Sequence, residues 1–566
     1  MGIPSYFVHL VKNHTSIIKH YDSSMIDIEN LYLDSNSIIY DAVLNVKYLK
    51  DDKEFENKLI KWIYDKIIFY VNLIKPKKLL YVAFDGVAPL AKLEQQRSRR
   101  YKGWYTNNYL VNEENQNEKW DTTAITPGTN FMKLLSNKIK KYFETNFNSD
   151  YKTKIKVIVS SSDDVGEGEH KIFQYIRLHK EYHKRSNSVI YGLDADLIML
   201  TLLHSCYIDN IYLFRETPYF INSIDNSLLP NQLYVMDIKE LGYKIINTMS
   251  NTVSNKVSSI VSNTVSSTDL ENFQKTKSYG EYINDYIFIC FLLGNDFMPH
   301  FPAINIRTNG VSILLDVYKK LFDNKDTIIR NDVIVWKNFK KFVGLISENE
   351  NYYCKNEELI RKKQEKKILN GINSNIGGEN ENNQLLLNKP LLERDVEKFI
   401  NIGEDGWRER YYSELFFMDI NDSRRKQICI NYLEGLEWNF KYYKNGCADW
   451  RWKYKYNYPP TFLDLHAFIP FFDTTFIEAN DNKPVKQLVQ LAYVLPRNSL
   501  FLLPKKLHER LISGYEDIYK LDFKIMWSFC RYFWEAHVEL PEFKIEIIEN
   551  LVKNLVENLV ENLVEK

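Results

Sequence analysis

Short apolar runs that end in polar turns recur along the N-terminal part of the chain. They are Asn30–Asp34, Lys77–Phe84, Ile155–Ser162, Ser188–Leu193, Asn210–Phe214 and Gln232–Met236. Some of the segments between them have the spacing of a helix, as after Ile155–Ser162, where apolar residues stand at positions 172, 173 and 176. Because strands that alternate with helices are typical of a parallel sheet, the pattern predicts an α/β fold with a mainly parallel sheet.

The pattern changes further along the chain. A Ser/Asn/Val-rich low-complexity stretch predicts a surface insertion at about 249–270 within a first domain that spans residues 1–345. Residues 346–392 are rich in Asn, Lys and Glu and predict a polar linker. The Tyr- and Trp-dense residues 393–540 predict a second folded region. Residues 541–566 end in four copies of NLVK or NLVE, a repetitive tail to which we assign no function.

Composition narrows the class of protein. A chain of 566 residues with 45% hydrophobic residues can bury a sizeable core. The formal net charge is +0, so any binding of nucleic acid would depend on local basic patches. The six cysteines include no CxxC pair, which argues against a zinc ribbon or a disulfide scaffold. Since the longest apolar run, Tyr286–Leu293, is too short to cross a bilayer, we expect a soluble intracellular protein.

Acidic residues follow the ends of the apolar runs. The seven candidates are Asp34, Asp85, Glu167, Glu169, Asp194, Asp196 and Asp296. Strand ends of a parallel sheet share one edge, where these carboxylates would repel one another unless cations neutralise them. Oxygen ligands without Cys or clustered His select Mg²⁺ or Mn²⁺. A single acid there is commonly a turn or capping residue, but five acidic segments together favour a two-metal site for phosphoryl displacement.

A basic helix is predicted directly after Asp85. At helical spacing Lys92, Gln96, Arg99 and Arg100 share one face. Two guanidinium groups and an ammonium match a terminal phosphate. Basic helix faces are often merely solvated, yet the position beside Asp85 favours a phosphate-binding role.

Taken together, the motifs resemble one family. They occur in the order MGIPSYF, LYLDSNSIIY, FDGVAPLAKLEQQRSRR, ITPGTNFM, GEGEHKIFQYIR, YGLDADLIML and FLLGNDFMPHFP, followed by GWRERYY, YLEGLEWNFKYY and WRWKYKYNYPP. This series is similar to the 5′→3′ exoribonucleases of the XRN family, over most of residues 1–540. The resemblance implies a FEN/PIN-like nuclease domain with a mainly parallel central sheet, and a mostly helical, aromatic-rich second conserved region that buttresses the active site.

The resemblance also implies roles for individual residues. The acids matching Asp34, Asp85, Glu167 and Glu169 would serve mainly one divalent ion, and those matching Asp194, Asp196 and Asp296 the other. The positions of Lys92, Gln96, Arg99 and Arg100 would bind a 5′-monophosphate. The implied reaction is hydrolysis of the first phosphodiester by a metal-activated water, with two Mg²⁺ ions that Mn²⁺ can replace.

Aromatic residues are expected to bind the RNA strand by stacking, which suits recognition without sequence preference. Residues 438–458 are dense in Trp and Tyr, and either Trp450 or Trp452 is the candidate stacker. A plain aromatic core is the alternative for any one of these rings. Two departures from the family pattern stand out: Tyr40 replaces a His and would offer a stacking face, and Val165 replaces a Pro and would loosen the loop before Glu167.

Three functions were compared on these residues. The first is processive hydrolysis of 5′-monophosphorylated single-stranded RNA to 5′-mononucleotides in mRNA decay. We expect a monomer in the cytoplasm. The charged run Arg361–Lys367 has the composition of a nuclear signal, so a nuclear location is the alternative. The second is a flap-type structure-specific DNA nuclease with the same carboxylates. The third is a non-catalytic RNA-binding scaffold, which the presence of all seven acids disfavours.

Overall fold

The structure is a computed structural model that describes most of the chain. The described residues are 5–22, 27–48, 50–110, 120–150, 154–208, 210–215, 221–230, 232–250, 278–322, 326–374 and 381–564. The predicted insertion at about 249–270 lies outside them, apart from its first two residues. None of the described helices combines the length and apolar character needed to cross a bilayer.

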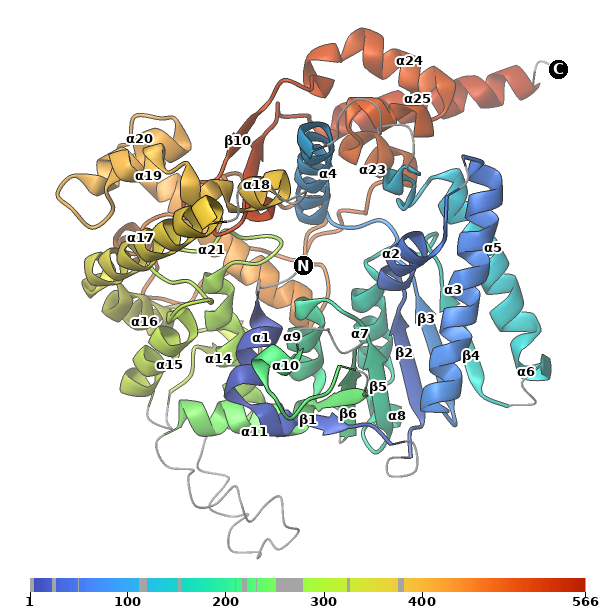
Figure 1. Cartoon of the computed structure of the whole chain (residues 1–566), viewed down its shortest axis with the longest axis horizontal. Helices are drawn as coiled ribbons and strands as arrows, with labels where there is room; N and C mark the ends of the chain where they lie inside the picture. The colour runs from blue at the N-terminus through green and yellow to red at the C-terminus, as the bar shows by residue number, and fades with distance from the viewer. Residues whose placement is uncertain are drawn as a thin grey trace, which may run out of the picture.

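A seven-stranded sheet forms the core of the N-terminal part, in the order β1-β7-β6-β5-β2-β3-β4 (Figure 1). Its strands are β1 (Ile18–His20), β2 (Asn30–Asp34), β3 (Leu79–Ala83), β4 (Lys156–Ser160), β5 (Asn187–Tyr191), β6 (Asn210–Phe214) and β7 (Tyr234–Asp237). Strands β2 to β6 are parallel to one another, whereas β7 is antiparallel to β6, and β1 is antiparallel to β7. The predicted mainly parallel sheet is confirmed, and its six predicted strands are all present; only the three-residue β1 was not foreseen.

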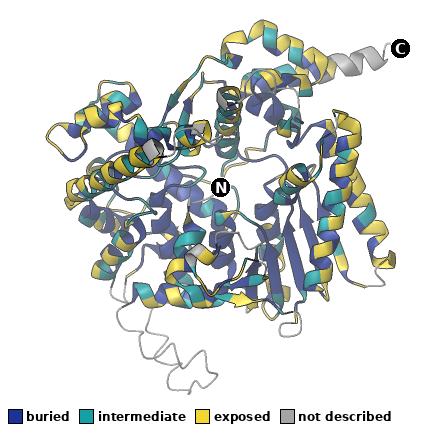
Figure 2. Ribbon diagram, viewed as in Figure 1, coloured by how far each residue is buried: buried dark blue, intermediate teal, exposed yellow. Residues whose placement is uncertain are grey.

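Alternate residues of the central strands pack into two different cores, as the two-residue period of a strand requires. Leu31 and Leu33 of β2 pack with α2 (Asn36–Asn45), α3 (Asp52–Ile74) and α5 (Asn130–Thr145). Tyr32 of β2 packs on the other face with α7 (Gly168–Leu178), α9 (Ala195–His204), α11 (Ile238–Met249) and α14 (Tyr279–Cys290). Figure 2 shows the result, buried strands between helices whose outer faces are exposed.

The C-terminal part is mostly helical, as expected. Its helices are α15 (Gly310–Leu321), α16 (Trp336–Glu348), α17 (Glu350–Ser374), α18 (Glu381–Leu392), α19 (Asp395–Ile400), α20 (Trp407–Phe416), α21 (Asp422–Lys444), α22 (Phe462–Phe468), α23 (Gln487–Val494), α24 (Lys505–Gly514) and α25 (Ile545–Val564). Two hairpins accompany them, β8 (Ile329–Arg330) with β9 (Val333–Ile334), and β10 (Lys524–Met526) with β11 (His537–Glu539). Short helices elsewhere are α1 (Tyr6–Asn13), α6 (Phe147–Asp150), α8 (Lys180–His183) and α10 (Ile221–Ile224).

The expectation of a polar linker at 346–392 is wrong, because most of this segment is helical. Helices α17 and α18 lie within it and pack against each other. Arg361, the first residue of the charged run Arg361–Lys367, is buried. Its Nε and Nη2 donate to the carboxylate of Glu397 over 3.0 and 2.6 Å. Arg394 is fully buried and contacts the same carboxylate. The charges therefore pair inside the fold, which composition alone does not reveal.

The start of the repetitive tail is also part of the fold. Helix α25 packs against α23, and its Ile548, Val552 and Leu555 are buried. The same core contains Leu90 and Leu93 of α4 (Leu90–Leu110). A four-residue apolar repeat drifts around a helix, yet the described turns of α25 suffice to cover α23.

Helix α4 stands between the two parts of the chain (Figure 1). The amide of Leu90 donates to the carbonyl of Trp450 over 3.0 Å, and Arg97 Nη1 donates to the carbonyl of Pro541 over 3.1 Å. Glu94 accepts from both Lys453 and Tyr493. The basic helix predicted after Asp85 is thus anchored mainly by residues of the C-terminal part.

Candidate active site

The predicted acids gather where the parallel strands end. Asp34 is the last residue of β2, and Asp85 follows β3 by two residues. The other candidates stand at the first turns of α7 and α9 and in the loop after α14, and they are Glu167, Glu169, Asp194, Asp196 and Asp296. The chain order reverses between β2 and β5, which makes this edge a topological switch point, where ligands bind in open α/β sheets.

Asp85 is held by a set of hydrogen bonds that its own turn does not supply. Asn36 Nδ2 donates to Asp85 Oδ2, and the Asp85 amide donates to Asn36 Oδ1 over 3.0 Å. The Gly168 amide donates to Asp85 Oδ1 over 2.7 Å. A Cβ on Gly168 would stand 2.7 Å from Asp34 Oδ1, so any larger residue would displace that carboxylate from the α7 N-terminus.

The acids are mostly withdrawn from water and raise one another's pKa. Asp34, Glu167, Glu169 and Asp196 are 8%, 4%, 7% and 3% exposed, whereas Asp194 is exposed. Burial, with the charges of Asp85 and Asp194, raises the pKa of Asp34 well above its usual value. Burial and Asp196 do the same to the pKa of Glu169.

The pKa of Asp196 is another that burial and a neighbouring carboxylate raise. Burial and the charge of Asp296 raise the pKa of Asp196 to about 7. Burial likewise raises the pKa of Asp85, with Glu167 as the next cause. Clustered carboxylates with raised pKa values hold protons that a bound cation would displace.

Lys92 lies among the acids instead of on the phosphate-binding face. Its Nζ is 2.7 Å from both Glu167 Oε2 and Asp296 Oδ2, and its side chain is 14% exposed. Burial alone would raise the pKa of Asp296, but the Lys92 ammonium outweighs it and holds that pKa below the usual value. The Lys92 ammonium therefore pairs with the acids in this structure, because the first turn of α4 stands nearest them and their charge attracts it, and its role in phosphate binding stays a prediction.

The donor set fits divalent cations. Among the described residues, no group of three or more acidic, histidine or cysteine side chains surrounds one point as metal ligands would. The Lys92 ammonium stands between two of the acids, Glu167 and Asp296. Three buried carboxylate oxygens nevertheless have no hydrogen-bond partner among the described residues: Asp34 Oδ1, Glu169 Oε2 and Asp196 Oδ1. Buried carboxylate oxygens rarely stay unpaired, and hard oxygen donors suit Mg²⁺ or Mn²⁺.

The rest of the predicted phosphate-binding face is present beside the acids. Arg99 is exposed, and its Nη2 donates to the hydroxyl of Tyr40 over 3.3 Å. Arg100 Nη2 donates to Thr126 Oγ1, while its Nη1 is buried with no partner among the described residues. Burial lowers the pKa of Arg100 to about 10, which leaves the guanidinium charged at neutral pH. The buried Gln96 Oε1 also has no partner within the described part.

The two candidate stacking tryptophans differ in their exposure to solvent. Trp452 is 7% exposed and its ring stacks on Trp438 with centroids 5.1 Å apart, so no face is open to a base. Its assignment to RNA stacking is wrong, because the ring belongs to the core. Trp450 is half-buried and stays a candidate, and Tyr40 is 36% exposed beside Arg99.

The loop before Glu167 is tied to the turn after Asp85 by backbone hydrogen bonds. The Gly166 amide donates to the carbonyl of Val87 over 2.8 Å, and the Gly86 amide donates to the carbonyl of Gly166 over 2.9 Å. These two backbone bonds join the loop to the turn after Asp85. Neither bond involves Val165, so a looser loop stays a prediction.

Two tyrosines of α21 were missed as neighbours of the acids. Tyr442 is buried and its hydroxyl donates to Glu167 Oε1 over 2.7 Å. Its ring stacks on His170 with centroids 3.7 Å apart. Tyr443 is buried next to it, and the charge of Asp196 is the second cause, after burial, that raises its pKa. The sequence shows two consecutive tyrosines in NFKYYK, but it does not show that they face the acids. Their direction depends on how α21 packs.

The comparisons agree with this arrangement. A family model described as "XRN 5'-3' exonuclease N-terminus" matches residues 1–217, and one described as "Xrn1 helical domain" matches residues 276–388 and 372–566. The chain is 27% identical over 678 residues to 5'-3' exoribonuclease 2 of Arabidopsis thaliana, covering 96% of this chain and 66% of that protein. It is 28% identical over 652 residues to the Drosophila melanogaster 5'-3' exoribonuclease 2 homolog, covering 96% and 69%.

Longer relatives and a solved structure complete the comparison. With 5'-3' exoribonuclease 1 of Schizosaccharomyces pombe the identity is 25%, over 96% of this chain but only 47% of that protein. The catalytic core of Rad2 in complex with DNA substrate matches 64% of this chain and 81% of its own, with 11% identity and a TM-score of 0.30, too slight a likeness to support an argument. The helical-domain model alone matches more than half of the chain and the N-terminal model most of the remainder, so the chain belongs to the XRN 5′→3′ exonuclease family.

Proposed function

We propose that the chain is a 5′→3′ exoribonuclease that hydrolyses 5′-monophosphorylated single-stranded RNA processively to 5′-mononucleotides, in RNA decay. The observation that carries this proposal is the joining of two features on one helix. The acid cluster meets the start of α4 at Lys92, and the guanidinium groups of Arg99 and Arg100 follow two turns later. Family membership supports the same activity, as does the match of 96% of this chain to a curated exoribonuclease, of which the chain covers 66%.

The acids are proposed to hold two Mg²⁺ ions. Asp34, Asp85, Glu167 and Glu169 would serve one ion, and the second would be held by Asp194, Asp196 and Asp296. When bound, such ions supply charge stabilisation and an activated water for an in-line displacement at phosphorus. Lys92 pairs with Glu167 and Asp296 in this structure, so ion binding would require this ammonium to move away from at least one of them.

The side chains around the acids orient the ligands. Asn36 and the Gly168 amide fix Asp85, and Tyr442 fixes Glu167. Partners of this kind hold a carboxylate in one geometry and keep it from turning away when the cation binds. The burial of the cluster keeps bulk water away and strengthens each electrostatic contact.

Arg99 and Arg100 are proposed to determine which bond is cut. A terminal phosphate bound by two guanidinium groups at a fixed distance from the acids places the first phosphodiester, and no other, at the cations. A 5′-hydroxyl offers these groups no charge. Preference for a monophosphate and removal of one nucleotide at a time would both follow from this spacing.

The experiment compares four substrates with Mg²⁺ present: RNA with a 5′-monophosphate, a 5′-hydroxyl or a cap, and flap DNA. The expected result is release of 5′-mononucleotides from the monophosphorylated RNA only, lost in Asp296→Asn. Equal rates on phosphate and hydroxyl ends, or faster cleavage of flap DNA, would overturn the proposal. Action as a monomer, and in the cytoplasm, stay predictions.

A further inference from the structure

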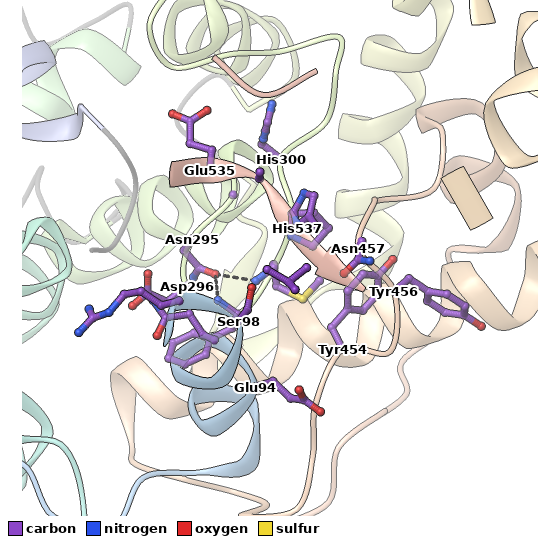
Figure 3. A pocket seen from close by; sticks show the side chains of 18 of the residues that line it. Glu94, Ser98, Asn295, Asp296, His300, Tyr454, Tyr456, Asn457, Glu535 and His537 are labelled. Carbon is purple, nitrogen blue, oxygen red and sulfur yellow. Dashed lines mark hydrogen bonds between the residues drawn. The ribbon is translucent and has the colours of Figure 1, made fainter. Parts of the chain in front are cut away.

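A cavity of about 590 Å³ opens beside the acid cluster on another face of α4. Figure 3 shows Glu94 and Ser98 of α4 on one side of it, Asn295 and Asp296 on a second, and Tyr454, Tyr456 and Asn457 on a third. Most of the α4 positions that line it, such as Glu94, Ser98 and Lys102, are rotated by roughly 120° around the helix from Lys92 and Gln96, whereas Arg99 borders both faces.

The cavity touches both parts of the proposed active site. Asp296 lines it and belongs to the acid cluster, while Arg99 lines it and belongs to the phosphate-binding face. The acids at the ends of β2, β3 and β5 do not line it, so the space begins where the cluster ends. A molecule released between Asp296 and Arg99 would have this cavity directly beside it.

The lining suits a nucleotide in size and in chemistry. Pockets for small ligands measure about 300–1,000 Å³ and combine apolar walls with a few polar groups. Trp534, 36% exposed, and the half-buried Tyr454 and Tyr456 offer ring faces for a base. The exposed Lys455 offers positive charge for a phosphate, whereas Arg307 is paired with Glu535 across the same lining.

Buried polar groups at the cavity wall lack partners. The Lys102 ammonium donates to the carbonyls of Trp534 and Ala536 over 2.8 and 2.6 Å, so the described contacts use two of its three N–H groups. Arg97 is 3% exposed, and its Nη2 has no partner among the described residues. The buried Gln95 Oε1 has none either within the same residues. Unsatisfied buried donors and acceptors of this kind are rare without a ligand or water.

We propose that this cavity is the exit chamber for the product, a 5′-mononucleotide that passes through it on leaving the cations. The inference rests on the proposed exoribonuclease activity. A processive enzyme keeps the remaining RNA bound on the entry side, and the new 5′-phosphate cannot reach Arg99 and Arg100 until the cleaved nucleotide has left. A separate route allows release without release of the RNA.

The test narrows the cavity without touching the acids or the guanidinium pair. Ser98→Phe fills the α4 side, and Asn457→Phe fills another wall without altering α4. Asn107→Phe, at an exposed α4 position outside the cavity, is the matched control. Cleavage of the first bond is measured by rapid quench with enzyme in excess, and mononucleotide release with monophosphorylated RNA in excess.

We expect Ser98→Phe and Asn457→Phe to lower steady-state release by about tenfold or more while first-bond cleavage stays within about twofold, because product release then limits turnover. Asn107→Phe should match the wild type in both. If both rates fall together in the filled variants, or neither falls, the exit chamber is refuted. A wild-type protein that fails to cut the first bond would instead overturn the proposed function.

Discussion

Replacing Tyr442 by Phe tests whether the C-terminal part positions the metal ligands. The change removes one hydroxyl, which donates over 2.7 Å to the buried carboxylate of Glu167. The ring would remain packed between His170, at 3.7 Å between centroids, and Trp438, at 4.8 Å. The fold should therefore persist while Glu167 loses its donor.

The magnitude follows from the charge of the acceptor. A hydrogen bond to a charged group is worth about 1.5–3 kcal/mol, and partners of metal ligands typically contribute about 10- to 100-fold in metal affinity. We expect the Mg²⁺ concentration for half-maximal RNA cleavage to rise by about 10- to 100-fold in Tyr442→Phe. Saturating Mg²⁺ should restore most of the activity.

Tyr411→Phe is the matched control. Tyr411 is also buried, and its hydroxyl donates over 2.9 Å to a neutral acceptor, the carbonyl of Pro459. It should lose a similar amount of stability and keep the wild-type Mg²⁺ requirement. An unchanged Mg²⁺ titration in Tyr442→Phe, or an equal shift in both variants, would refute the positioning role.

Three further predictions address the phosphate-binding face, the protons of the acids and the buried charges. Arg99→Ala combined with Arg100→Ala should bring the rate on 5′-monophosphorylated RNA down to that on 5′-hydroxyl RNA, with an unchanged Mg²⁺ requirement; a surviving preference contradicts it. Burial raises the pKa of Asp196 to about 7, so Mg²⁺ affinity measured by calorimetry should rise from about pH 6 to about pH 8. Without metal, the protein should become less stable between these pH values, because the folded state holds the Asp196 proton more tightly than the unfolded state does. A thermal midpoint that rises with pH would contradict this prediction. Arg394→Ala should cost up to about 3–5 kcal/mol in urea unfolding, since it removes a buried guanidinium that pairs with three carboxylates and leaves the buried Glu397 with Arg361 alone, whereas Lys398→Ala, at a half-exposed ammonium, should change little.

The acid cluster was predictable because it depends on local pattern and on one rule of topology. Asp34 ends an apolar run, and Asp85 and Asp194 follow two others within two or three residues; parallel strands bring such ends to one edge whatever the rest of the fold does. The hydrogen-bonding partners of the acids were not predictable. Asn36 stands two residues from Asp34 yet binds Asp85, and Tyr442 is 275 residues away from Glu167.

The differences between the predictions and the structure have a common physical origin. Helical spacing gives the angle of Lys92 around α4, but the electrostatic attraction of the acids decides where its flexible side chain goes. Composition placed Arg361 in a polar linker, whereas Glu397 from another helix pairs with it inside the fold. Whether Trp452 faces RNA or the core depends on Trp438, which stacks on it. In each case the deciding neighbour comes from a separate element.

The long-range bond between Tyr442 and Glu167 also bears on when the enzyme becomes active during its own synthesis. The two residues are 275 positions apart. At about 5–20 residues per second, a ribosome would complete Tyr442 roughly 15 to 55 s after Glu167. The contacts of α4 with Trp450, Tyr493 and Pro541 form later still. A nascent chain would thus expose its acids without the residues that orient them, and the messenger being translated would not meet a finished nuclease until the chain was nearly complete.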